Sequence, residues 1–138
     1  MEVSQELEKA KDVLNNERET AYRNALHGDI AIDIDEAGKL VTVNGGLDNL
    51  WSLQTAYESL FVDPDVPEID ASLKQADGSL VRCTQAEWEH LLKAMRNFGK
   101  NLFIKNEVVI AYIGMLTVDN TMAEVWNTTW ENIDVPTE

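Results

Sequence analysis

The sequence predicts a mostly helical α+β fold, with a long helix near the C-terminus and two short β-hairpins that form a small sheet. Residues 84–116 keep a helical repeat of apolar side chains, whereas residues 29–43 and 69–83 alternate apolar and polar positions around glycine-containing turns. The chain of 138 residues is long enough to bury a core. We expect an N-terminal helix, residues 1–28, followed by a single α+β domain, residues 29–133.

The N-terminal helix is predicted over residues 2–27 by a 3-4 spacing of apolar residues, at Val3, Leu7, Ala10, Leu14 and Ala21. Glu17 interrupts this row, and the row holds few large apolar side chains. We therefore expect the helix to dock on a stronger element or to wind with a partner.

Both hairpins are predicted from a change to a period of two. In residues 29–43, alternating isoleucines lead into a turn at 36–39, and a run of Leu-Val-Thr-Val follows. In residues 69–83 the turn contains Asp77 and Gly78, which is a common hairpin signal.

Two acidic segments resemble metal sites only superficially. Asp33, Asp35 and Gly38 match the first, third and sixth positions of a calcium loop, but carboxylates are missing at the fifth and twelfth. The carboxylates of the loop at 63–70 have no histidine or cysteine nearby. We therefore predict no metal site and no cofactor.

A second helix is predicted over residues 47–61, where apolar residues form a wide face. Trp51 and Tyr57 lie within or beside this face, and we expect both in the core.

The long helix at 84–116 begins with Thr84 and Glu87, which match a capping box. Unbroken, it would be roughly 45–50 Å long, whereas a compact chain of this size has a radius of gyration of about 14 Å. It should therefore project or break, most readily at Gly99. Two apolar rows at heptad spacing indicate a buried face, either in the protein's own core or against another chain. The rows are Trp88, Met95, Leu102, Val109 and Leu116, and Leu91, Phe98, Lys105 and Tyr112.

A last helix is predicted over residues 119–133. Trp126 and Trp130 are four positions apart, which would place both indoles on one helical face. They either complete the core or anchor a partner, since tryptophan is enriched among such anchors. The predicted partner-binding residues are Trp126, Trp130, Leu102 and Val109.

Composition excludes several classes of function. With 11 basic and 25 acidic residues the net charge is −14, so we expect binding neither to nucleic acid nor to an anionic membrane. No apolar run approaches the roughly 20 residues of a membrane span. The lone cysteine, Cys83, is predicted to be buried and inert, and with only His27 and His90 as histidines no enzyme is expected.

Several short motifs follow one another in a characteristic order. They are an Arg-containing helix, an Asn-Gly-Gly turn, an Ala-Asp-Gly turn, a Thr-x-x-Glu helix start and a final Trp-containing helix. This order resembles a small domain of uncharacterised function found in bacteriophage tail proteins, including tail fibre assembly proteins. The matching segments are 18–23, 41–46, 47–60, 75–78, 83–88 and 117–130.

The chain also departs from that pattern. Lys74 and Gln75 stand where the family often has a tryptophan, and a helix replaces the β-rich N-terminal region of the larger assembly proteins. The resemblance implies no catalytic residues.

The expected function is therefore non-catalytic. The resemblance implies a phage tail-associated protein that binds a tail fibre or related tail protein, as an assembly chaperone or as an adaptor. It would act in the host cytoplasm and, as an adaptor, stay in the virion tail. The long helix also suggests a homo-oligomer. The alternative is an acidic inhibitor that mimics nucleic acid, since residues 1–70 hold 16 acidic against 5 basic residues.

Overall fold

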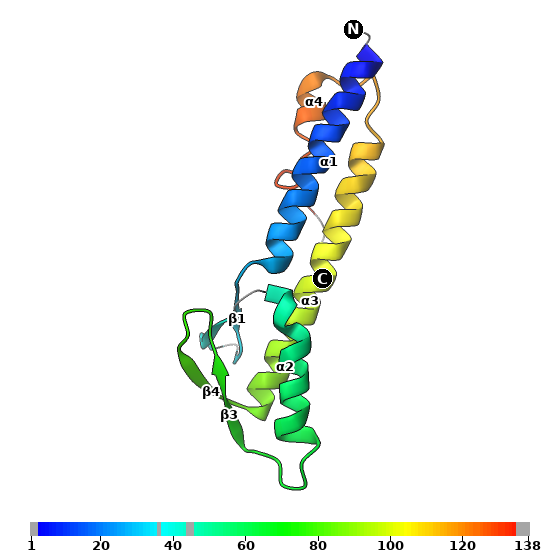
Figure 1. The fold of residues 1–138 in the computed structure, drawn as a ribbon. Coiled ribbons are helices and arrows are strands. Elements are labelled where there is room, and N and C mark those ends of the chain that lie inside the picture. Colours follow the sequence, from blue (N-terminus) through cyan, green and yellow to red (C-terminus); the bar gives the residue numbers. More distant parts are fainter. Residues whose placement is uncertain (1–2, 36, 44–45, 135–138) are drawn as a thin grey trace. The chain divides into compact units, whose positions relative to one another are not determined.

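The computed structural model describes residues 3–35, 37–43 and 46–134; residues 36, 44 and 45 of the predicted turns lie outside the described part. The protein is a mostly helical α+β fold, with 59% of its residues in helices, and this confirms the predicted fold class (Figure 1). It divides into two compact units: residues 1–25 with 100–138, and residues 26–99. The predicted division into residues 1–28 and 29–133 stays a prediction.

The first unit, residues 1–25 with 100–138, is a packing of helices. α1 (Val3–His27) lies beside the C-terminal half of α3 (Gln85–Gly114), and α4 (Met122–Trp126) adds a third element (Figure 1). All three elements contribute to one apolar core: Leu7, Ala10, Leu14, Val109, Ile113, Leu116 and Val125. The expected docking of the N-terminal helix on a stronger element is thus confirmed for this unit.

The predicted last helix at 119–133 is wrong in its extent, because α4 stops at Trp126. Its start is set by a capping box in which Thr121 Oγ1 accepts from the Glu124 amide at 3.1 Å. Beyond Trp126 the hydroxyls compete with helical bonding: Thr128 Oγ1 donates to the Glu124 carbonyl, and the Asn132 amide donates to Thr129 Oγ1. These bonds favour turns over a continued helix.

The second unit, residues 26–99, contains both predicted hairpins. β1 (Ile30–Asp33) pairs with β2 (Leu40–Val43), and β3 (Asp70–Lys74) pairs with β4 (Leu80–Thr84), both antiparallel. Each pair is its own two-stranded sheet. Gly78, at φ +88°, supplies the left-handed position of the second turn.

Helical turns of three kinds cover residues 46–62, where one helix was predicted. A 3₁₀ turn (Gly46–Asn49) leads into α2 (Leu50–Tyr57), which ends in a π-helical turn (Glu58–Val62). Trp51 is 76% exposed, so the expectation that it lies in the core is wrong. Residues two apart on a helix point to nearly opposite sides, and Leu53 is the one that packs on the core.

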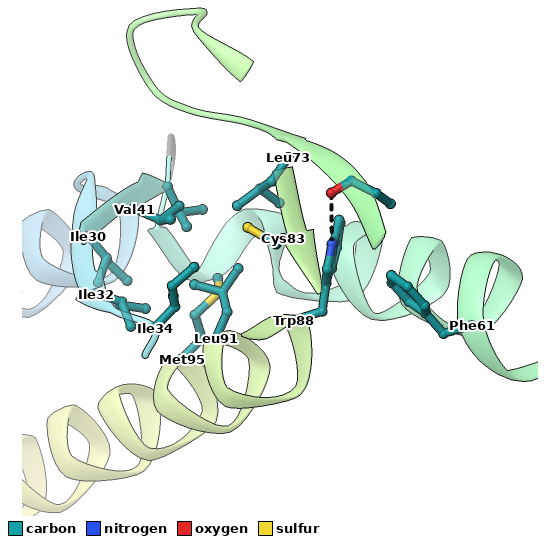
Figure 2. Close-up of a cluster of buried hydrophobic side chains, with 12 residues drawn as sticks. Ile30, Ile32, Ile34, Val41, Phe61, Leu73, Cys83, Trp88, Leu91 and Met95 are labelled. Atoms are coloured by element: carbon teal, nitrogen blue, oxygen red, sulfur yellow. Dashed lines mark hydrogen bonds between the residues drawn. The ribbon is translucent and has the colours of Figure 1, made fainter. Parts of the chain in front are cut away.

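The core of the second unit joins both sheets to α2 and the N-terminal half of α3 (Figure 2). Trp88 donates from Nε1 to the Ala71 carbonyl at 3.3 Å and packs near Phe61, with ring centroids 6.1 Å apart. Cys83 and Met95 are buried in the same cluster, so the predicted burial of the thiol is confirmed.

α3 is one unbroken helix, so the break at Gly99, which was one of the two alternatives, does not occur. The predicted capping box is present: the Thr84 amide donates to Glu87 Oε1 at 2.9 Å, and the Glu87 amide donates to Thr84 Oγ1 at 3.2 Å. Gly99 has a packing role instead, because a Cβ there would lie 2.9 Å from Leu47 Cδ1.

Candidate protein-interaction surfaces

The inner face of α3 changes register along the helix. Near its start Leu91 and Leu92 are both buried, but farther on the buried residues are Asn106 and Ile113 instead of the predicted Lys105 and Tyr112. A straight α-helix drifts by about 20° per heptad against a 3.5-residue repeat, which shifts the buried row by one residue. Tyr112 is consequently 50% exposed.

The four residues predicted to bind a partner do not form one surface. Val109 has no exposed side-chain area and belongs to the core of the first unit. Leu102 is half-buried. Trp130 is half-buried, with its ring 6.0 Å from that of Tyr22 and the Lys105 ammonium 4.7 Å from its centroid. Trp126 is 45% exposed and is the one of the four that offers substantial surface.

The outer side of the C-terminal half of α3 is apolar as well. Between residues 102 and 116 the charged residues are Lys105 and Glu107. The outer seam, as we name it, follows a 4-3-4 spacing and consists of Ile104, Val108 and Ala111 of α3 together with Met115, the residue directly after its end. The Met115 amide still donates to the Ala111 carbonyl at 3.0 Å, so Met115 continues the helical spacing. Met115 is 70% exposed, and Tyr112 flanks the seam. An exposed apolar row opposite an already buried one is a feature of surfaces that a partner covers, so this seam is a candidate for a covered surface.

A smaller apolar face lies on α4. Met122 and Trp126 are four residues apart, on one side of the helix, and both side chains are about half exposed. The sequence identified Trp126 but paired it with Trp130, which lies beyond the end of the helix. The outer seam also has a 3-4 spacing in the sequence, but it is shorter than the two heptad rows, which predict only the opposite face.

The second unit contains a groove of about 570 Å³ between α2 and β3. Its apolar lining comes from Val43, Leu53, Leu73 and Trp88, and its polar rim from Asn49, Ser52, Ser72, Lys74, Gln75 and Asp77. No local pattern predicts this groove, because it needs α2 and β3 side by side.

The acidic turn of the first hairpin uses its carboxylates for the backbone. Asp33 Oδ2 accepts from the Gly38 amide at 3.1 Å. Asp35 Oδ1 accepts from the amides of Lys39 and Ala37, at 3.0 and 2.9 Å, and these two bonds lower the pKa of Asp35. Within the described residues no three His, Cys, Asp or Glu side chains are grouped so as to hold a metal ion.

The thiol of Cys83 is not built for chemistry. It is buried, and burial raises its pKa, which disfavours the reactive thiolate.

Among the described helices none has the length and apolar character needed to cross a bilayer.

Comparison with known proteins leaves the family open. No protein-family model matches the chain, and neither a curated protein nor a solved structure shows significant similarity to it.

Proposed function

We propose that this protein is a non-catalytic binding protein that attaches to a phage tail fibre, or a related tail protein, as an assembly chaperone or adaptor. The outer seam of α3 supports this proposal most directly. A chain of net charge −14 presents there an uncharged row flanked by Tyr112, with Met115 at its end. An apolar row suits contact with an apolar protein surface.

The choice of a tail fibre as partner rests on the sequence resemblance. Fibre chains are rich in β-structure, and before they trimerise they expose apolar surface and unpaired strands. A protein that covers such surface prevents aggregation if it is released afterwards, and acts as an adaptor if it stays. Purified virions distinguish the two roles, since an adaptor is present in them and a chaperone is absent.

Co-expression with the tail fibre protein, followed by affinity capture, tests the proposal. Met115→Asp places a charge within the outer seam, so we expect capture to fall about tenfold or more, because an unpaired carboxylate is costly to bury. Lys100→Asp is the control: Lys100 is an exposed, already charged residue of α3, one turn before Ile104, so its side chain is not part of the apolar seam and the variant should capture the fibre like the unaltered protein.

Circular dichroism melts should show both variants folded, since Met115 and Lys100 are both exposed. Undiminished capture by Met115→Asp would remove the seam from the proposal. Loss of self-association alone, detected by light scattering, would show that a second copy covers the seam instead.

A further inference from the structure

The outer edge of β3 carries backbone groups that point away from its partner strand. At the end of the hairpin the Gln75 amide donates to the Ser79 carbonyl at 2.8 Å. Hydrogen-bonded and non-hydrogen-bonded pairs alternate along an antiparallel ladder. In the register that pairs Ser72 with Arg82 and Lys74 with Leu80, the amides and carbonyls of Ser72 and Lys74 therefore face outward.

The same alternation explains contacts at two other edges. It turns Thr42 outward on β2, where the Thr42 amide donates to Gln75 Oε1 at 3.1 Å and its carbonyl accepts from the Ala76 amide at 2.9 Å. It turns Arg82 outward on β4, where its carbonyl accepts from Lys39 Nζ at 2.9 Å. Those edges are thus at least partly closed by the protein itself.

The edge of β3 differs, because no described residue pairs with the outward backbone groups of Ser72 or Lys74. Both residues line the groove of about 570 Å³, with Ser52 and Leu53 of α2 on its other side. An exposed strand edge is a template on which another chain can pair, so this edge, lying inside a groove, is a candidate docking site.

We propose that this groove binds an extended peptide segment of another protein, which adds to β3 as a further strand. Donors and acceptors two residues apart repeat at about 6.6–6.8 Å, which matches an extended chain, whereas a helix has no free backbone groups along its length. Alternate apolar side chains of the segment would lie toward Leu53, which is only partly buried. Lys74, exposed and without an ion pair to any described residue, favours a carboxylate on the segment.

This site lies in the unit of residues 26–99, so it is independent of the outer seam. The probe is a phage-displayed library of random peptides of about twelve residues, selected against the full chain. The best peptide is synthesised and its affinity measured by fluorescence anisotropy. Ser72→Pro removes one outward amide, and proline is tolerated at such edge positions. We expect about tenfold weaker binding, whereas Ser72→Thr, which keeps the amide, should bind like the unaltered protein.

Two further arms make the test decisive. Ser52→Tyr fills the groove from α2 without altering β3 and should abolish binding. N-methylation of alternate peptide amides should do the same, because it removes the donors that a strand needs. The proposal is overturned if the library yields no peptide that prefers the unaltered protein over Ser52→Tyr, if Ser72→Pro and Ser52→Tyr bind undiminished, or if the bound peptide is helical by circular dichroism.

The outcome is separable from that of the proposed function. Met115→Asp should leave peptide affinity unchanged, since Met115 belongs to the other unit. If fibre capture depends on Met115 but the library yields no peptide, the peptide-binding groove is refuted and the proposed function stands. If the groove binds a selected peptide but the protein does not capture the fibre, the proposed function is refuted and the peptide-binding groove stands.

Discussion

The guanidinium Nη1 of Arg18 donates a hydrogen bond to Asn106 Oδ1 and so links α1 to the C-terminal half of α3. Asn106 is buried in the row that otherwise holds Val109 and Ile113, and Arg18 also donates from Nε to Asn15 Oδ1 at 3.3 Å. No carboxylate of the described residues forms a salt bridge with Arg18. A polar pair inside an apolar seam costs stability but favours the register that satisfies it.

The first prediction concerns that pair. Asn106→Ala leaves the half-buried guanidinium of Arg18 without its main acceptor, so we expect a loss of about 1–3 kcal/mol in the free energy of unfolding. Replacing both residues by leucine should recover most of this loss, because apolar residues of similar size suit the seam. Urea unfolding of Arg18→Leu, of Asn106→Leu and of the double variant measures the coupling free energy between the two residues. A strictly additive double would show that the hydrogen bond contributes nothing.

The second prediction separates the inner face of α3 from its surface. Val109→Asp buries an unpaired carboxylate in the core of the first unit and should destabilise it by several kcal/mol. Leu102→Asp should cost less, because Leu102 is half-buried, and Lys100→Asp should lie within about 0.5 kcal/mol of the unaltered protein. Equal melting temperatures for the three variants would contradict the burial of Val109 on the inner face of α3.

The sequence allowed correct predictions wherever the determinants are local. The Thr84–Glu87 capping box and the Asp77-Gly78 turn each depend on side chains within a few positions, and both are present. The orientation of Trp51 was not predictable in this way, because an apolar residue on a short helix can face the core or solvent and only the tertiary packing decides. Gly99 shows the same limit: its low helix propensity marked it as the weakest point of the helix, whereas in the structure its missing Cβ makes room for Leu47.

The candidate surfaces were harder to predict for the same reason. Trp126 stood out by residue type and is exposed, but Val109 followed the same helical logic and is fully buried. The groove combines Ser52 of α2 with Ser72 of β3, twenty positions later, and its open strand edge follows from the pairing of a hairpin. A one-dimensional pattern contains neither the juxtaposition nor the unpaired amides.

The third prediction concerns the lone thiol. Cys83→Ser should cost roughly 1–2 kcal/mol of stability, because it places a hydroxyl in an apolar cluster, and should leave partner binding unchanged. The native thiol should react slowly with a thiol reagent at neutral pH, since burial raises its pKa. Rapid labelling of the folded protein, or loss of binding by Cys83→Ser at an unchanged melting temperature, would point to a reactive cysteine.

The last prediction concerns the dependence of stability on pH. Lys39 Nζ lies 2.8 Å from Glu87 Oε2, and the Thr84 amide donates to the same carboxylate, so the pKa of Glu87 is lowered, chiefly by Lys39. A carboxyl group with a lower pKa in the folded state stabilises the fold above its unfolded pKa of about 4.3, and this contribution is lost as the pH falls through the folded pKa. At about pH 6 Glu87→Gln should therefore have a lower melting temperature than the unaltered protein, and the difference in melting temperature should narrow toward about pH 3. Glu107→Gln, which alters an exposed carboxylate of the same helix, is the control and should follow the unaltered protein throughout. A difference in melting temperature that stays constant with pH would show that the charge of Glu87 does not contribute to the acid dependence. Glu87 would then act only through its hydrogen bond to the Thr84 amide.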